Sequence, residues 1–445
     1  MNFTGLPPEA VPALMTGTIA HHPIVEGRAD AYLPSPCIQN HAANLAFLPD
    51  GTLTCVWFGG TMEGMGDISI YMSHLAPGGE HWSVPEKMSD DPEKSEQNPL
   101  LFNAPDGKVW LLYTSQTFGN QDGSVVKCRI SDDGGQTFGP VQILCDSPGT
   151  FVRQQIVVNG RGDWLLPVFR CIGLNGQRWS GNADTAAVLI SRDGGASWQM
   201  RDIPDSIGAV HMNILPLAGG EMIAFYRNRF AENILSSRSS DGGETWSAPE
   251  PAELPNNNSS IQATILNDGT IAMVYNHSNA AMSDARRQSL YDEIEDGEAG
   301  EPAVVADNSA RKAVWGVPRA PLSLAISRDG GRSFPHRVDL DTGDGFCLSN
   351  NSKDSLNREF SYPSIVQGGD GTLHIAYTYY RRAIKYISLA RNSCRKQSGS
   401  QKIVIPHPLA CERTQDDNGC ELTAEKFDNS VGLFTAAAKM MASCV

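Results

Sequence analysis

Pairs of short apolar runs on either side of a glycine turn return six times along this chain. One copy reads Leu45-Ala-Phe-Leu-Pro-Asp-Gly51-Thr-Leu-Thr-Cys-Val-Trp-Phe58, and another reads Ala263-Thr-Ile-Leu-Asn-Asp-Gly269-Thr-Ile-Ala-Met-Val-Tyr275. Two apolar runs joined by a tight glycine turn are the signal of a β-hairpin. The sequence therefore predicts six hairpins. Their turn glycines are Gly51, Gly107, Gly162, Gly220, Gly269 and Gly371.

An octapeptide of the form Ser-x-Asp-x-Gly-x-(Thr/Ser)-(Trp/Phe) follows an apolar run four times. The copy Ser191-Arg-Asp-Gly-Gly-Ala-Ser-Trp198 is matched by copies that begin at Ser131, Ser239 and Ser327. The glycines permit positive φ, the Asp and hydroxyl side chains can bond nearby backbone N–H groups, and the aromatic ring can anchor the loop. We interpret these octapeptides as structural loops of a repeated unit.

Six hairpins with recurring loops predict an all-β fold, a six-bladed β-propeller. The interval between Gly269 and Gly371 is about twice the others. That interval leaves two alternatives open, a seventh blade or one long insertion. We interpret residues 277–319, which include the acidic run Asp292–Glu298, as a loop on blade five.

Each blade is expected to run from inner strand A through the glycine turn to B, then C, the octapeptide and D. Blade six lacks an octapeptide, and we expect residues near Thr18–Val25 to supply its outer strand, which closes the ring. The expected organisation is an N-terminal arm over 1–17, a propeller over 18–392 and a tail over 393–445. The tail has no blade signal and is interpreted as disordered or artefactual.

The formal net charge of −15 over 445 residues argues against a nucleic-acid binder, because phosphate contacts need a basic surface. Neither a leader pattern nor an apolar run long enough for a bilayer is found, so we expect a cytoplasmic protein with no membrane partner. The ten cysteines lack metal-site spacing, and we expect buried free thiols, no metal, no cofactor and a monomer. Five of these thiols adjoin apolar runs: Cys55, Cys128, Cys145, Cys171 and Cys347.

Polar residues occupy the position nine or ten residues before each turn glycine. In a propeller that position lies at one mouth of the central channel, on the face opposite the octapeptides. Six polar side chains that converge on one point are a candidate site. The set is His41, Gln97, Arg153, His211, Ser260 and Tyr362.

Further polar residues are expected at the same mouth. Arg227 ends the fourth B strand, Arg358 precedes the sixth A strand, and the blade-one loop supplies Glu63 and Asp67. For His41 and Arg153 a structural role at the channel rim is the alternative. The pair at positions 381–382, Arg381 and Arg382, is interpreted as solvated surface.

The octapeptides resemble the Asp-box, or BNR, repeats of the sialidase superfamily. In sialidases a tyrosine on the last blade is the nucleophile, a glutamate activates it, three arginines hold the substrate carboxylate, and a blade-one acid protonates the leaving group. The resemblance implies that Tyr362 is that tyrosine and that Glu63 or Asp67 is the acid. Arg227 and Arg358 are then the expected carboxylate binders.

Blade one departs from the sialidase pattern. Where sialidases have Arg-Ile-Pro, this chain has Asn40-His41-Ala42, and the sequence assigns no glutamate partner to Tyr362. The chain is also similar to sialidase-like propellers that cleave rhamnose-α-1,4-glucuronate caps by elimination or hydrolysis. Under elimination, Arg153, Gln97 and Arg358 would neutralise the uronate, while His41 and Tyr362 would serve as base and acid.

The sequence thus predicts an enzyme, a glycosidase or a polysaccharide lyase, that cleaves a terminal linkage in a sialic- or uronic-acid glycan. His211 joins Gln97, Arg153, Arg227 and Arg358 as a predicted substrate contact. The alternatives are a rhamnose-α-1,4-glucuronate lyase and a propeller that binds an anionic oligosaccharide without cleaving it.

Overall fold

The structure is a computed structural model that describes residues 7–117, 119–173, 179–287, 290, 311–347 and 352–390. The predicted tail 393–445 and the acidic run 292–298 lie outside the described residues. Within the described part no helix is long and apolar enough to cross a membrane.

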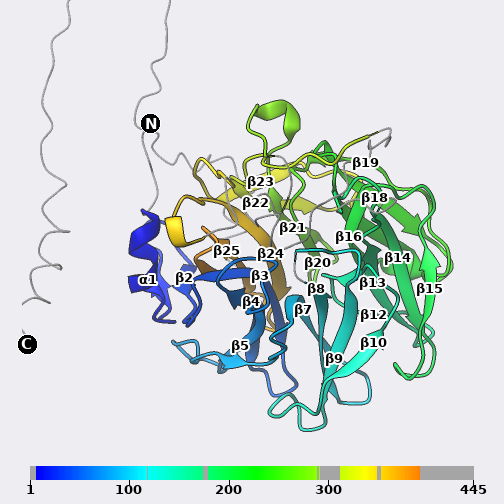
Figure 1. The fold of residues 1–445 in the computed structure, drawn as a ribbon, viewed down its shortest axis with the longest axis horizontal. Helices are drawn as coiled ribbons and strands as arrows, with labels where there is room; N and C mark the ends of the chain where they lie inside the picture. The colour runs from blue at the N-terminus through cyan, green and yellow to red at the C-terminus, as the bar shows by residue number, and fades with distance from the viewer. Residues whose placement is uncertain are drawn as a thin grey trace, which may run out of the picture. The chain divides into compact units, whose positions relative to one another are not determined.

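Six antiparallel sheets follow one another around a central axis in chain order, so the predicted six-bladed β-propeller is confirmed (Figure 1). The innermost strands of successive sheets pack against one another, including β24 on β3 where the ring closes. These innermost strands are β3 (Gln39–Phe47), β7 (Lys94–Asn103), β11 and β12 (Thr150–Val152 and Val157–Val158), β16 (Ala209–Pro216), β20 (Gln262–Ile265) and β24 (Phe360–Gln367).

The outer strands of each blade follow in order from the channel to the rim. The second strands are β4 (Leu53–Gly60), β8 (Val109–Thr117), β13 (Trp164–Arg170), β17 (Met222–Asn228), β21 (Ile271–Asn276) and β25 (Leu373–Tyr379). The third are β5 (Ser69–Leu75), β9 (Val125–Ser131), β14 (Thr185–Ser191), β18 (Asn233–Ser239), β22 (Leu322–Ser327) and β26 (Ala383–Leu389). The outermost are β6 (Glu86–Lys87), β10 (Gln142–Cys145), β15 (Gln199–Asp202), β19 (Glu250–Pro255), β23 (His336–Asp341) and β2 (Arg28–Tyr32).

Blade six is closed by the N-terminal part of the chain. Strand β2 pairs with β26, and β1 (Ala20–His21) adds a fifth strand beside β2. The N-terminal part of the chain therefore supplies the closing strand, as expected. The strand that pairs with β26 is Arg28–Tyr32, however, and not the expected segment near Thr18–Val25. Arg28 fixes the true position, because its buried guanidinium bonds Asp30 and donates to the Leu340 carbonyl in blade five.

The N-terminal arm is short and partly helical where it is described. It contains η1 (Pro8–Ala10) and α1 (Val11–Leu14), and Val11 is fully buried in the apolar cluster that joins blades five and six. Three further 3₁₀ turns lie in loops: η2 (Ala218–Gly220), η3 (Ala280–Met282) and η4 (Ser352–Asp354).

The long interval in blade five is an insertion and not a seventh blade. It connects β21 to β22, and a β-bridge between Arg287 and Trp315 ties its two described arms together. Of the five expected thiols, Cys145 is half-buried and the other four are buried, and all of them are free.

The Asp-boxes fold as their residue types predict. In the blade-three copy the Asp193 carboxylate accepts from the Ser197 amide at 2.9 Å and from the Ser197 hydroxyl at 2.5 Å. The Ser191 hydroxyl donates to Asp193 and accepts the Gly195 amide at 2.8 Å. Gly195 has φ +90°, and any Cβ there would lie 2.8 Å from two tryptophan rings. Both the backbone conformation and the lack of space therefore require glycine at this position.

A β-bulge interrupts most of the innermost strands near one mouth of the channel. In β24, residues Tyr362 and Pro363 lie unpaired between the pairs formed by Ser361 and Ser364, and Tyr362 has a positive φ of 51°. Ala42, Asn98 and His211 occupy the same place in their strands, also with positive φ. Each of the four stands nine residues before its turn glycine. The bulge position therefore lies nine residues before the turn glycine, whereas the sequence predicted nine or ten. In blade one this puts Ala42, not His41, at the bulge.

Candidate active site around Tyr362

Tyr362 is the centre of the candidate site. Its hydroxyl accepts a hydrogen bond from Nη1 of Arg227 at 2.5 Å, and Nε of Arg227 donates to the Asn258 side chain at 2.8 Å. Tyr362 and Arg227 are buried, with 7% and 2% of their surface exposed, respectively. No carboxylate pairs with Arg227 in the part of the chain that the structure describes. The tyrosine hydroxyl is therefore held by a cation that keeps its charge available for a ligand.

Two histidines flank the tyrosine ring. The ring centroids of His41 and Tyr362 are 4.2 Å apart, and those of His211 and Tyr362 are 5.5 Å apart. Burial, together with the charge of Arg381 for His41 and of Arg227 for His211, holds the pKa of each imidazole well below its usual range. Both rings are therefore neutral at pH 7, and a neutral imidazole can take up a proton only at the nitrogen that carries none.

The hydrogen bonds of these rings fix the tautomer of His211 and are compatible with both tautomers of His41. Since a guanidinium only donates, Nε2 of His211, 3.5 Å from Nη1 of Arg227, must accept, which puts the proton on Nδ1. The Thr378 hydroxyl accepts the Ala42 amide and lies 2.8 Å from Nδ1 of His41, where it can donate or accept. Among the described residues, Nε2 of His41 and Nδ1 of His211 are buried and have no hydrogen-bond partner. Each imidazole thus keeps one nitrogen for a ligand or water.

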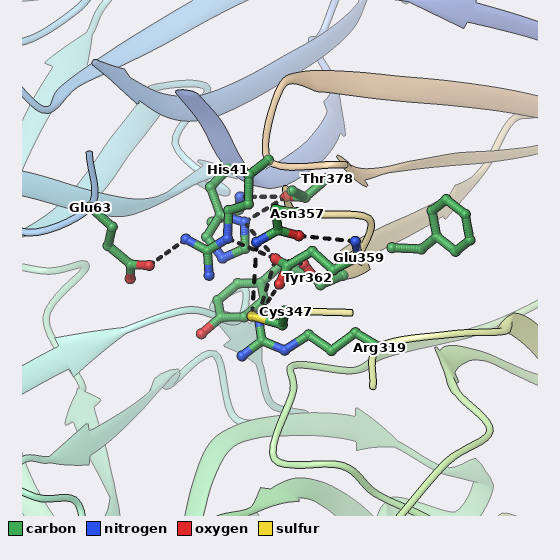
Figure 2. A network of polar contacts seen from close by, with 12 residues as sticks. His41, Glu63, Arg319, Cys347, Asn357, Glu359, Tyr362 and Thr378 are labelled. Atoms are coloured by element: carbon green, nitrogen blue, oxygen red, sulfur yellow. Dashed lines mark hydrogen bonds and ion pairs between the residues drawn. The ribbon is translucent and has the colours of Figure 1, made fainter. Parts of the chain in front are cut away.

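A chain of four buried charges lies beside His41 (Figure 2). Glu359 accepts from Arg381 at 2.7 Å and from Arg319 at 3.2 Å, and Arg381 also forms an ion pair with Glu63. Nδ1 of His41 is 3.9 Å from the Glu359 carboxylate. Although burial opposes it, the charges of Arg319 and Arg381 hold the pKa of Glu359 well below its usual range. The network is therefore two cations and two anions whose charges balance.

Arg381 is buried, with 1% of its surface exposed, so its interpretation as solvated surface is wrong. The reason is the turn between β25 and β26. Tyr380 and Arg381 both have positive φ, at 57° and 56°, and Arg382 N–H bonds the Tyr379 carbonyl at 3.0 Å. Positive φ at both central residues of a turn is the conformation that usually carries Asn-Gly, and here three residues connect the paired Tyr379 and Ala383. Arg382, next to it, is half-buried.

A second buried ion pair borders the site on blades three and four. Asp184 accepts from Nη2 of Arg229 at 2.7 Å and from the Trp179 indole at 2.8 Å. Trp315, from the blade-five insertion, lies 5.3 Å from the Arg229 guanidinium and 5.9 Å from that of Arg227. The insertion thus reaches over the arginine side of the site.

The chain is similar to a known family in sequence and to known proteins in fold. Residues 51–375, well over half of the chain, match the family described as BNR repeat-like domain. The chain belongs to the BNR repeat-like family. No curated protein sequence matches the chain.

Solved structures share the fold of this BNR repeat-like propeller at low identity. A Hadza microbial sialidase aligns with a TM-score of 0.58 and 12% identity over 80% of this chain and 66% of its own, slightly less than two thirds. A protein of unknown function from Dyadobacter fermentans aligns with a TM-score of 0.60 and 15% identity over 82% and 100%. The NanB sialidase from Streptococcus pneumoniae aligns with a TM-score of 0.57 and 12% identity over 80% and 69%. The sialidase-like propeller is therefore the fold of this chain.

The BNR repeat-like propeller brings most of the predicted site residues together. Tyr362 contacts His41, His211 and Arg227, and the Arg153 guanidinium lies 5.3 Å from its ring centroid. Ser260 reaches this group through Nε of Arg153 at 3.2 Å. Glu63 is linked to it through Arg381 and Glu359.

Three predicted residues make their polar contacts elsewhere. The Gln97 amide donates to Ser95 at 3.0 Å, and Arg358 pairs with Asp344 at 2.8 Å. Asp67 is exposed, and its carboxylate accepts the amide and hydroxyl of Thr61, so it closes its own loop. None of these bonds connects Gln97, Arg358 or Asp67 to the group around Tyr362.

Sequence reasoning missed the residues that build the charge network: Glu359, Arg319 and Arg381. Glu359 stands three residues before Tyr362 and next to the predicted Arg358. Because neighbouring side chains of a strand point to opposite faces, the sequence could have shown that Glu359 and Arg358 face different ways. Arg319 ends the blade-five insertion, where no periodic signal exists. Among the described residues, His, Cys, Asp and Glu form no cluster that could hold a metal ion.

Proposed function

We propose that this BNR repeat-like propeller cleaves a terminal glycosidic bond at a sugar that carries a carboxylate, such as a sialic or uronic acid. The observation that carries the proposal is the buried Arg227, which has no carboxylate partner among the described residues and donates to the Tyr362 hydroxyl. A buried guanidinium without a counter-charge favours an anionic ligand, and its fork matches a carboxylate. Two of the structural neighbours are sialidases, which agrees with such a substrate class.

The chemistry rests on three side chains that surround Tyr362. Arg227 neutralises the sugar carboxylate and any negative charge that develops on Tyr362. His41 and His211 are neutral imidazoles on the two sides of the tyrosine. His41 takes up a proton at Nε2 when its own proton is on Nδ1, and His211 offers its Nδ1–H as a donor. His41 is fully buried and Tyr362 keeps 7% of its surface exposed, so in this proposal the terminal sugar enters end-on past Tyr362.

Elimination is the second candidate, and a specific observation favours it. In sialidases a glutamate activates the tyrosine, whereas here the Tyr362 hydroxyl accepts from Arg227, and the same nitrogen of Arg227 bonds His211. Glu359 is held by two arginines and Ser361 instead. In a uronate elimination, a base takes the C5 proton, the C4–O bond breaks, a C4–C5 double bond forms, and an acid protonates the leaving oxygen. Imidazole and phenol groups are suited to both proton transfers.

The test is product analysis on a panel of sialosides and rhamnosyl-uronides. Elimination gives an unsaturated uronate that absorbs in the ultraviolet, whereas hydrolysis gives a free reducing sugar without that absorbance. Turnover of any acidic glycoside that is lost in Arg227→Met supports the proposal. Tight binding of a panel member without turnover would identify a non-catalytic glycan-binding propeller and would overturn it.

A further inference from the structure

Four backbone carbonyl groups converge on the side chain of Arg153. Its Nη2 donates to the carbonyls of Ala43, Tyr362 and Pro363 at 3.0, 3.1 and 3.1 Å. Its Nη1 donates to the Ala42 carbonyl at 3.5 Å, and its Nε to the Ser260 hydroxyl at 3.2 Å. One side chain from blade three therefore crosses the channel and bonds blades one, five and six.

The four carbonyls belong to the two β-bulges next to the catalytic candidates. Ala42 and Ala43 are the unpaired residues of β3, and Tyr362 and Pro363 are those of β24. A bulge removes its residues from the ladder, and a buried carbonyl without a donor is costly. A guanidinium, with five donors in a planar fork, can serve several such carbonyls at once.

Arg153 has no role as a ligand contact in this arrangement. Its three guanidinium nitrogens are bonded to the protein, it is 1% exposed, and no carboxylate pairs with it in the described ranges. Both Ala42 and Tyr362 have positive φ, at 62° and 51°, a conformation that residues other than glycine seldom adopt. The contacts of Arg153 hold this conformation on both sides of the channel.

We infer that Arg153 is a positioning residue that sets the backbone of Tyr362 and, through Ala42, that of its neighbour His41. The expected effect on catalysis rests on the proposed function. The expected effect on the position of Tyr362 rests on the geometry alone. Without the guanidinium, the carbonyls of the two bulges lose their shared donor, and the tyrosine ring loses its fixed place against Arg227 and His41.

The chain offers a matched control in Arg129 of β9. Its guanidinium donates to three backbone carbonyls, those of Met88, Phe138 and Gly139, at 2.7 to 2.8 Å. It joins blade one to the Asp-box of blade two, away from the channel. Arg129→Met therefore removes the same kind of bonding without touching either bulge.

The structural test places 3-fluorotyrosine at position 362 and records its ¹⁹F resonance in Arg153→Met, Arg153→Lys and Arg129→Met. We expect the resonance to shift or split in both Arg153 variants and to stay in place in Arg129→Met. The lysine variant keeps the charge but concentrates its donors at one point, and it decides the question if the methionine variant does not fold. A folded Arg153 variant whose resonance matches the parent protein would overturn the inference.

The kinetic test uses any glycoside of the panel that the parent protein cleaves. We expect kcat to fall by about 100-fold in Arg153→Lys with KM within about twofold, because a small misplacement of a reacting group has that effect. A rise in KM at unchanged kcat would instead make Arg153 a substrate contact and overturn the inference. If no glycoside is cleaved, the proposed function fails while the resonance experiment still decides the role of Arg153.

Discussion

Nη1 of Arg227 lies 2.5 Å from the hydroxyl oxygen of Tyr362 and 3.5 Å from Nε2 of His211. A single nitrogen thus donates to both groups, and neither can give a proton back to it. The tyrosine proton is therefore directed away from the arginine, toward whatever occupies the site.

Tyr362→Phe removes this hydroxyl and leaves the ring. We expect turnover to fall by about 10²- to 10⁴-fold, the usual contribution of an acid or base group. The melting temperature should change little, because the ring keeps its contact with His41. The control is Tyr386→Phe in β26, which removes a hydroxyl bonded to His374 of β25. Near-normal kcat in Tyr362→Phe would contradict the assignment.

The two buried histidines predict a loss of stability in mild acid. The unfolded chain protonates them below about pH 6.5, whereas the folded pKa of each is well below that value. The unfolded state therefore binds more protons, and the free energy of unfolding falls as the pH decreases from about 6.5. Each histidine contributes up to about 1.4 kcal/mol per pH unit. Urea unfolding at several pH values between 7 and 5 gives the free energy of unfolding as a function of pH. This free energy should fall less steeply with decreasing pH in the double variant His41→Asn/His211→Asn than in the parent protein, and equal pH dependence would refute the prediction.

Glu359→Gln should destabilise the protein strongly. It leaves Arg319 and Arg381 buried with one shared anion removed, and breaking a buried ion pair costs about 3–5 kcal/mol. Asp344→Asn is the comparison, since its bond to Arg358 is partly exposed and is expected to contribute about 1 kcal/mol or less. Denaturant titration measures both. Similar losses in the two variants would mean that the network around Glu359 is not a structural centre.

Asp193→Asn tests the Asp-box. Hydrogen bonds from the side chain and backbone of Ser197 and from Ser191 lower the pKa of Asp193 to about 2. A lowered carboxyl pKa stabilises the folded state above the unfolded value near pH 4, and this contribution is lost as the pH falls toward 2. The gap in melting temperature between the parent protein and Asp193→Asn should be widest at pH 5 and narrow by pH 2. The exposed Asp146→Asn serves as the control, and a gap that does not change with pH would exclude this role.

The fold could be predicted because its signals are local. Each glycine turn and each Asp-box is specified by adjacent residues, so their repetition predicts the ring. The candidate site could be predicted only where that repeat extends to it, as for Tyr362 and His211 at the bulges. Arg381 and Arg319 lie in a turn and an insertion that do not repeat, and their burial depends on a carboxylate brought from another segment. Arg153 was placed correctly at the channel, but its carbonyl partners become visible only with the register of the bulges.

The pairing of β2 with β26 has a consequence for biosynthesis. Strand β2 is translated before the blades and pairs only with β1 until β26 has followed, so the sheet that carries Tyr362 is completed after the other five. Any nascent chain short of β26 holds one unpaired edge of β2. A circular permutant that opens the ring between two other blades would let this sheet form from contiguous residues, and it would then no longer be the last to form.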